Sequence, residues 1–466
     1  MPLRPPPPVS SNPLVRIAKD VVAERRATVP FPPGWTDFSL KRTTKFSRDP
    51  LPLLLAGYER FGPVFTIRVL HGNVVFMIGP EANHYMTVSN AANFTWRDGH
   101  LGDMIPLLGD GLLTIDGEFH RRSRKIMLPA FHHEQIVKTQ ATMDEEIARG
   151  IEGWRSGDRV DLYAWTRVLA LRIAMRALFG LDPDDRADTA AAHDFEEALG
   201  FWSRDYMLQV LRGPGTPWQR LHKARGRLDA LIFAEIDRRR TTGARGEDIL
   251  SLLLDATDEE GEGLSKRHIR DEVMTLLFAG HDTTTSTVAF LFYELSRAPE
   301  ARARVIEDLD AGATAELELA LDETLRLYPA AWIGPRRAVE SFEFAGVQVP
   351  GGIPVNYCSW ASHHLPDVFE DPERFDPQRF APGNREQIPK GAYVPFGGGS
   401  RTCIGMRFGQ QEIRTIARAI LERFEPQLEP GYELVIRQMP TIGPKHGLPL
   451  ILRERASLSP GARVAA

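Results

Sequence analysis

One long helical segment in the second half of the chain constrains the fold more than any other feature of the sequence. Residues 265–298 follow a helical pattern and are apolar from Met274 to Ala279 and again from Val288 to Leu295. At about 1.5 Å of rise per residue, a helix of more than 30 residues would span a whole domain. We therefore expect this helix to be central to the fold.

The composition of the chain excludes several classes of protein. Its 466 residues are 42% hydrophobic and 26% charged, which excludes an intrinsically disordered chain. A net charge of -5, from 57 basic and 62 acidic side chains, gives no overall attraction to nucleic acid, so we expect no nucleic-acid partner. The length alone leaves the number of domains open.

Cysteine content and the ends of the chain bear on the cell compartment. Cys358 and Cys403 are too few for a disulfide-rich secreted scaffold or a four-cysteine zinc site. Glycines and prolines interrupt the longest uncharged stretch, residues 344–366, so we expect no membrane anchor. Prolines stand at 5–8, where a signal peptide would need an apolar core, and we interpret residues 1–29 as a flexible, proline-rich leader. These features predict a cytoplasmic protein.

Outside the long segment, helical patterns alternate with short runs of β-forming residues. Residues 64–70 and 74–78 are β-rich and are joined by His71-Gly72-Asn73, which predicts a hairpin. No internal repeat or linker plainly divides the chain. The other predicted elements are helices over most of 118–180, over 314–328 and over 404–424, β-like runs within 342–349, and loops over 212–217, 238–247 and 362–395.

The sharpest motif is a glycine-rich loop, residues 395–405, which places Cys403 just ahead of the last predicted helix. The helix dipole, nearby backbone N–H groups and Arg401 would all stabilise a thiolate there, and the glycines would let the backbone approach a flat ligand. One thiolate presented in this way suits the axial position of a haem iron. A dinucleotide loop is disfavoured, because Thr402 stands where G-x-G-x-x-G needs its third glycine, but a buried, inert cysteine is an equal alternative on this motif alone.

A second motif, A-G-H-D-T-T at residues 279–284, lies in the middle of the long segment. Its glycine weakens the helix, and the Thr283 hydroxyl can bond to the carbonyl oxygen four residues earlier, which predicts a local distortion that could hold water. Asp282 and Thr283 could then deliver protons to an iron-bound oxygen species. In a rival interpretation, His281 and Asp282 bind a catalytic metal together with further ligands, for which histidine pairs are available at 132–133 and 363–364.

Two charged pairs at helical spacing complete the set. Glu323 and Arg326, at i and i+3, can form an ion pair, and His120 and Arg124, at i and i+4, can point at one anion. Taken alone, each pair is explained at least as well by charged side chains on a solvated helix surface.

These four elements, in this order, resemble the cytochrome P-450 family of haem-thiolate enzymes. Residues 396–405 match F-x-x-G-x-R-x-C-x-G, residues 279–284 match A-G-x-D-T-T, and Glu323 with Arg326 matches E-x-x-R. The resemblance covers roughly residues 30–455. It implies a mainly α fold with small β-sheets, formed as a single large haem domain over residues 30–466.

The resemblance also assigns a structural network near the cysteine loop. Residues 375–380 match the family element F-x-P-x-R-F, which makes Arg379, rather than Arg374, the third member of a network with Glu323 and Arg326. Cys358 is expected to be a structural residue.

By the same resemblance, Cys403 is the axial ligand of the iron in haem b. Phe396 and Gly405 belong to the loop that contacts the cofactor. The family often has tryptophan at the position of His120, but an imidazole can also donate to a carboxylate. The resemblance assigns the haem propionates to His120, Arg124, Arg401 and Arg336, with Arg337 as a close rival of Arg336.

The reaction implied by the resemblance is O2-dependent hydroxylation or epoxidation of a small lipophilic substrate, with Asp282 and Thr283 supporting proton delivery. Residues 99–107 and 201–211 are expected to form pocket walls. On the helix over the haem, the expected pocket residues are Phe278, Ala279 and His281. His281 would contact a polar part of the substrate, unless it faces solvent.

No part of the chain resembles a reductase, so electrons are expected from a separate ferredoxin, flavodoxin or reductase. Arg121, Arg122 and Lys125 would steer an acidic partner to the cysteine side of the haem. The alternatives are a peroxide-driven peroxygenase or haem isomerase of the same fold, a non-catalytic haem sensor or electron carrier, and a metal-dependent hydrolase. The Asp282–Thr283 pair favours the monooxygenase over the peroxygenase and the isomerase.

Overall fold

Helices dominate the computed structural model, which describes residues 6–10, 12–181, 184, 186–204, 206–257 and 261–455. The α-helices are α1 (Pro13–Arg25), α2 (Leu40–Arg48), α3 (Leu51–Phe61), α4 (Pro80–His84), α5 (Ile105–Leu108), α6 (Gly117–Met127), α7 (His133–Ile151), α8 (Leu162–Phe179) and α9 (Arg186–Leu199). They continue with α10 (Tyr206–Val210), α11 (Pro217–Thr242), α12 (Ile249–Asp255), α13 (Lys266–Arg297), α14 (Pro299–Asp310), α15 (Ala315–Leu327), α16 (Ser359–Ser362) and α17 (Met406–Leu421).

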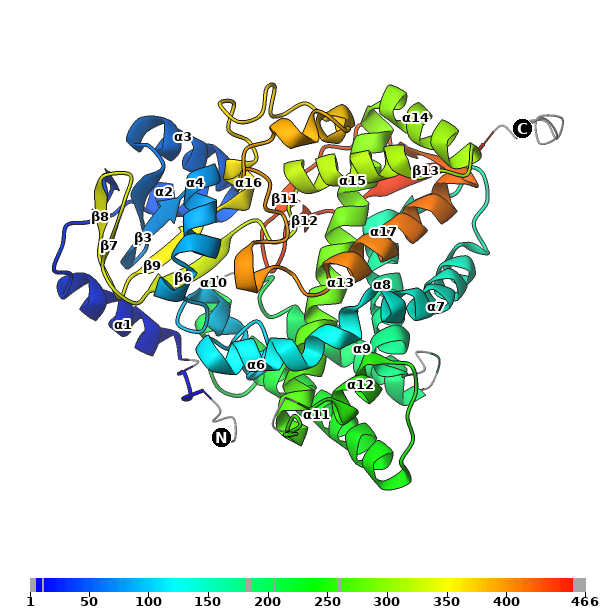
Figure 1. The fold of residues 1–466 in the computed structure, drawn as a ribbon, viewed down its shortest axis with the longest axis horizontal. Helices are drawn as coiled ribbons and strands as arrows, with labels where there is room; N and C mark the ends of the chain where they lie inside the picture. Colours follow the sequence, from blue (N-terminus) through cyan, green and yellow to red (C-terminus); the bar gives the residue numbers. More distant parts are fainter. Residues whose placement is uncertain are drawn as a thin grey trace.

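Four small sheets accompany these helices in the described part of the chain, in the strand orders β1-β2-β3-β9-β6-β4, β10-β13-β5, β11-β12 and β7-β8. The strands are β1 (Gly34–Trp35), β2 (Val64–Val69), β3 (Gly72–Met77), β4 (Phe94–Thr95), β5 (Arg159–Asp161), β6 (Gly334–Ala338), β7 (Phe342–Phe344), β8 (Val347–Val349), β9 (Pro354–Tyr357), β10 (Phe424–Leu428), β11 (Ile436–Arg437), β12 (Gly443–Pro444) and β13 (Pro449–Glu454). The predicted hairpin is confirmed as the antiparallel pair β2–β3, with Val64 opposite Met77. The largest sheet lies on the opposite side of the molecule from most of the long helices (Figure 1).

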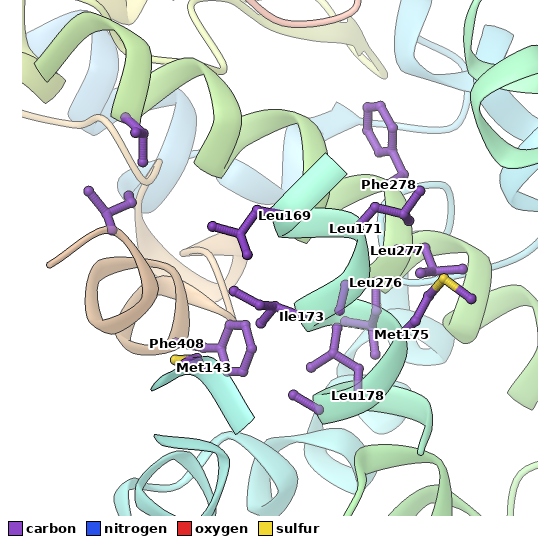
Figure 2. Close-up of a cluster of buried hydrophobic side chains, with 14 of the residues drawn as sticks. Met143, Leu169, Leu171, Ile173, Met175, Leu178, Leu276, Leu277, Phe278 and Phe408 are labelled. Carbon is purple, nitrogen blue, oxygen red and sulfur yellow. The ribbon is translucent and has the colours of Figure 1, made fainter. Parts of the chain in front are cut away.

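The expected central helix is α13. It begins where the Ser265 side chain caps it by accepting a hydrogen bond from the His268 N–H (3.1 Å). α13 packs against α8, α15 and α17, and about three quarters of its residues are buried. Figure 2 shows Ile173 of α8, Leu276 of α13 and Phe408 of α17 in one cluster of buried side chains, so these three helices share a hydrophobic core.

The N-terminal segment differs from the flexible leader that the sequence suggested, because residues 13–25 form α1 and lie against the largest sheet (Figure 1). One face of α1 carries charged side chains at every fourth position. The Arg16 guanidinium donates to the Gly99 carbonyl oxygen (2.9 Å), Asp20 pairs with Arg337, and Glu24 accepts from Arg68 (2.9 Å). These partners lie far along the chain, so local sequence patterns could not reveal them.

Candidate active site

A cavity of about 1600 Å³ lies between α13 and the loop that precedes α17. Phe278, Ala279 and Thr283 line it from α13, and Phe396 and Cys403 line it from the loop. The two predicted pocket walls also contribute, through His100, Leu101, Asp103, Met104, Phe201, Trp202, Ser203, Arg204 and Gln209. The fold therefore brings the two sharpest sequence motifs into one space.

Glycines in the cysteine loop let it approach η1, the π-helical turn Tyr85–Ser89. Gly397 and Gly399 have φ angles of 70° and 61°, which favour glycine. A Cβ on Gly399 would lie 2.1 Å from the Thr87 carbonyl oxygen, and one on Gly398 would lie 2.6 Å from the Thr87 hydroxyl. The glycines were expected to let the backbone approach a flat ligand, whereas in the structure Gly398 and Gly399 allow the cysteine loop to pack against η1.

Cys403 lines the cavity, to which it is exposed, and its backbone N–H donates to the Phe396 carbonyl oxygen (3.0 Å). Burial raises the pKa of this thiol, while the Gly405 backbone N–H and the charge of Arg124 act in the opposite direction. The cation that favours the thiolate is thus Arg124 on α6, whereas the Arg401 guanidinium, expected from the sequence to act on the thiolate, pairs with Asp116.

Cys358 lies in a contrasting environment. It is fully buried at the N-terminus of α16, where its sulfur accepts from the Ala361 N–H (3.3 Å). Burial raises the pKa of its thiol to about 12, so the group stays neutral. These contacts agree with a structural role.

Four basic side chains gather at one wall of the cavity: His120, Arg124, Arg336 and Arg401. His120 is neutral, because burial and the charges of Arg401 and Arg124 lower its pKa to about 3. Arg401 pairs with Asp116 (2.7 Å), and burial lowers the pKa of Arg401 only to about 10, so it stays charged. Asp116 acts on Arg336 and Arg401, whereas the group that acts on Arg124 is the Cys403 thiolate, so this wall carries more positive than negative side chains.

Arg336 and Arg337, which the sequence could not separate, occupy different environments. The Arg336 guanidinium stacks 3.6 Å from the centre of the Trp96 ring and lines the cavity. The Arg337 guanidinium donates to the Asp98 carbonyl oxygen (2.9 Å) and pairs with Asp20 of α1. Arg336 is therefore the member of the pair that a ligand in the cavity can reach.

Asp282 and Thr283 are adjacent in α13, but the structure points them in different directions. Thr283 lines the cavity, and its hydroxyl donates to the Ala279 carbonyl oxygen (2.6 Å), which is the bond expected for this turn. Asp282 does not line the cavity: one of its oxygens accepts from the Arg167 guanidinium (2.7 Å) and the other from the Thr441 hydroxyl. The helix continues through this turn.

The prediction that His281 contacts substrate or faces solvent is wrong. Its side chain is 0% exposed and does not line the cavity. Its Nε2 lies 2.9 Å from the Arg167 carbonyl oxygen and 3.0 Å from Glu196, on helices α8 and α9. A helix position that faces neighbouring helices cannot be told from one that faces a cavity by spacing alone.

Glu412 of α17 is a buried carboxyl group that the sequence analysis missed. It accepts from the Thr284 hydroxyl (3.0 Å), and burial raises its pKa to about 8. A signal was available, because Glu412 falls between Phe408 and Ile416 at the four-residue spacing of the buried face of α17. A glutamate within such an apolar stripe is buried.

The Glu323–Arg326 pair is fully buried and is not a surface salt bridge. Two parallel hydrogen bonds of 2.7 and 2.8 Å join the side chains. The Arg379 side chain lies 3.4 Å from Glu323, whereas Arg374 contributes its backbone carbonyl oxygen to Arg326 (3.3 Å). The geometry thus places Arg379 in the position of the third network member.

Neither a metal-binding cluster nor a membrane-spanning helix is found in the described part of the chain. No three histidine, cysteine, aspartate or glutamate side chains among its residues gather closely enough to hold a metal ion. No helix there combines the length and apolar character needed to cross a membrane.

Comparisons with known proteins are consistent with the geometry of this site. The family model described as cytochrome P450 matches residues 32–445. The chain belongs to the cytochrome P450 family. Among curated proteins, this P450 is 34% identical to cyclooctat-9-en-7-ol 5-monooxygenase of Streptomyces melanosporofaciens, over 70% of this chain and 75% of the relative. Cyclooctatin synthase of the same organism is 33% identical, over 74% and 79% of the two chains.

Solved structures give the same result for the P450 fold. A cyanobacterial CYP120A1 with bound retinoic acid superposes with a TM-score of 0.81 and 30% sequence identity, over 92% of this chain and all of the other. The haem domain of cytochrome P450DA gives a TM-score of 0.80 at 25% identity. The mainly α fold with small sheets is thus confirmed, and the protein is a P450 monooxygenase, an oxidoreductase whose family uses haem, O2, a redox partner and a substrate.

Proposed function

We propose that this P450 hydroxylates or epoxidises a small lipophilic substrate, with haem b bound between Cys403 and α13. One observation carries the proposal: Cys403 and Thr283 face the same cavity, and one wall of that cavity carries an excess of positive charge. When bound, the haem supplies the oxygen-activating chemistry, which an axial thiolate promotes. The chain supplies the ligand, the charges and the control of protons.

The residues around the cavity fit this cofactor. Haem b carries two propionates, and the guanidinium groups at this wall would balance their negative charges. We assign the propionates to Arg124, Arg336 and Arg401, with His120 as a neutral hydrogen-bond donor. Cys403 would hold the haem iron through its sulfur, and Phe396 and Gly405 line the cavity beside it.

Thr283 and Asp282 have separate tasks in this proposal. The Thr283 hydroxyl is the group that can hold or pass a proton in the cavity, because it faces that space and already donates to Ala279. Asp282 acts from outside the cavity, where Arg167 and Thr441 fix its carboxylate and thereby this turn of α13. Phe278 and Ala279 complete the wall that faces the substrate.

The substrate proposal rests on the apolar parts of the cavity wall and on the relatives. Phe201 and Trp202 are buried and pack edge to face with ring centres 5.1 Å apart. By their names, one relative oxidises cyclooctat-9-en-7-ol and a structural neighbour holds retinoic acid. We infer a largely hydrocarbon substrate with few polar groups for this enzyme.

Electron supply and location extend the proposal. We infer a separate ferredoxin, flavodoxin or reductase that docks on α6, where Arg121 and Lys125 are exposed. The cytoplasmic location expected from the sequence stays a prediction.

Isotope incorporation tests the proposed reaction. Holoenzyme should be combined with a ferredoxin, its reductase, NADPH and a library of lipophilic compounds under ¹⁸O2, and products analysed by mass spectrometry. We expect products that carry one ¹⁸O atom. Products that form only with added peroxide, or whose new oxygen comes from water, would overturn the proposal.

A further inference from the structure

His363 is a buried histidine that the sequence analysis noted only as a possible metal ligand. Its side chain is 0% exposed and lies in the segment that follows α16. The imidazole Nδ1 lies 3.0 Å from the Arg326 carbonyl oxygen, and the Arg326 guanidinium donates to the His363 carbonyl oxygen (2.8 Å). Each residue thus binds the backbone of the other through its side chain.

The Arg326 carbonyl oxygen needs such a partner. It lies in the last turn of α15, where carbonyl oxygens receive no hydrogen bond from a backbone N–H of the same helix. The His363 Nδ1–H donates to this oxygen, and the hydrogen bond holds the histidine against the Glu323–Arg326 pair. A buried carbonyl group left without a donor would cost stability.

The second nitrogen of His363 reaches the start of the cysteine loop. Its Nε2 accepts from the Val394 backbone N–H (2.9 Å), so the hydrogen bonds on both sides select the neutral tautomer with its proton on Nδ1. Burial and the charge of Arg326 also lower the pKa of His363, to about 3, which keeps the ring neutral. A protonated ring could no longer accept from Val394.

Short backbone contacts then lead from Val394 to the sulfur-bearing residue. The Val394 carbonyl oxygen accepts from the Gly397 N–H (3.1 Å). Two residues beyond Val394, the Phe396 carbonyl oxygen accepts from the Cys403 N–H (3.0 Å). The position of Val394 therefore sets where the turn around Cys403 begins.

We propose that His363 is a positioning residue that couples the buried Glu323–Arg326 pair to the cysteine loop and so holds Cys403 in place to ligate the haem iron. The inference rests on the proposed role of Cys403 for its effect on the haem. Its effect on the loop backbone depends on the chain alone.

Two measurements on His363→Phe test the coupling. The first is amide hydrogen exchange at Val394, which should become faster by about tenfold or more when its buried acceptor is lost. The second is the rate at which reduced, carbon monoxide-bound holoenzyme loses its thiolate-haem absorbance band on warming. We expect that rate to rise by a similar factor, about tenfold.

His364→Phe is the matched control. His364 is 3% exposed, and its Nδ1 bonds to the Trp360 carbonyl oxygen (2.7 Å) one turn earlier in the same segment. Among the described hydrogen bonds, none joins His364 to the cysteine loop. This variant should change both rates by less than about threefold.

A conservative variant keeps the test decisive if His363→Phe folds poorly. In His363→Gln the side-chain oxygen can still accept from Val394, so we expect smaller changes than in His363→Phe. The proposal fails if the Val394 amide exchanges as slowly in His363→Phe as in the natural protein. It also fails if His364→Phe accelerates that exchange equally, or if exchange in His363→Gln is as fast as in His363→Phe. If the natural holoenzyme lacks a thiolate band, the role of Cys403 fails while the exchange result still judges His363.

Discussion

The loop that carries Cys403 and the turn of α13 that faces it line the same cavity, yet their positions are fixed in different ways. Backbone contacts hold the loop: Gly399 leaves no room for a side chain beside Thr87, and Val394 binds a buried histidine. Side chains hold the α13 turn, where Thr283 bonds to its own helix and Asp282 pairs with Arg167. We conclude that substitutions at the loop should disturb the fold and the ligand, whereas substitutions at the turn should disturb the reaction.

The largest effect is expected at the buried Glu323–Arg326 ion pair, which supports the cysteine loop. Arg326→Met leaves the Glu323 carboxylate buried without its main partner, which should lower the free energy of unfolding by about 3–5 kcal/mol and reduce haem retention. Thermal unfolding and haem content would measure both. Arg418→Ala is the control, because its partner Glu422 (2.7 Å) is exposed, and should cost less than about 1 kcal/mol. Equal losses in the two variants would contradict the importance of the buried pair.

A glycine comparison is expected to give the next largest effect. Gly399→Ala combines a φ of 61° with a Cβ 2.1 Å from a carbonyl oxygen. Backbone strain alone should lower the free energy of unfolding by about 1–3 kcal/mol, and the close contact should lower it further. Gly226→Ala, within α11 and with no atom near its Cβ, should instead stabilise the protein by about 0.5–1 kcal/mol. Chemical denaturation of both variants decides the matter, and a shift of the same sign in both would count against backbone control of the loop.

In the α13 turn, Thr283→Ala should leave the free energy of unfolding nearly unchanged and should impair the reaction instead. Loss of the hydroxyl that faces the cavity should lower the product formed per electron consumed by about tenfold or more. Thr285→Ala removes an equivalent bond, from Thr285 to the His281 carbonyl oxygen (2.8 Å), at a position that does not line the cavity. Its coupling of electrons to product should stay normal. Similar uncoupling in both variants would exclude a specific role for Thr283.

Glu412 of α17 accepts a hydrogen bond from Thr284, next to the α13 turn, and its raised pKa predicts that the stability of the protein depends on pH. Its pKa of about 8 means that the folded protein holds a proton that the unfolded chain, with the ordinary pKa of about 4.5, has lost. The contribution of Glu412 to the free energy of unfolding is therefore greatest below about pH 4.5 and declines as the pH rises towards 8. Glu412→Gln should remove this decline, so its stability relative to the natural protein should increase by more than about 1.4 kcal/mol from pH 5 to pH 8. A constant difference over that range would disprove the raised pKa.

The smallest expected effect is on the surface of α6. Reversing the charges of Arg121, Arg122 and Lys125 together should raise the apparent KM for an acidic redox partner several-fold at low salt, with a weaker effect at high salt. Arg121 also lines the cavity, so the carbon monoxide spectrum of the reduced variant is the control and should match that of the natural protein. Unchanged kinetics at low salt would place the docking surface elsewhere.

The sequence predicted elements whose signals are local. The 265–298 pattern became α13 with ends within two residues, and the hairpin at 64–78 formed as expected. Motif spacing and family resemblance together also placed Cys403 and Thr283 at one site, which the cavity brings together.

Features that depend on distant partners could not be predicted. Asp20 of α1 pairs with Arg337, more than 300 residues away, so the segment looked like a free leader. His281 has the same spacing as a cavity residue but packs against α8 and α9. Arg401 lies near Cys403 in sequence, but Asp116 binds its guanidinium. In each case the side chain's direction depends on which elements meet in the fold.

The carbon monoxide spectrum of the reduced holoenzyme, compared between the two cysteines, tests thiolate ligation most directly. The natural protein and Cys358→Ser should both show the long-wavelength band of a thiolate-ligated haem, because Cys358 is buried away from the cavity. Cys403→Ser should fold and lack that band. If the band persists in Cys403→Ser, or is missing from the folded natural protein with haem bound, Cys403 is not the ligand of the haem iron.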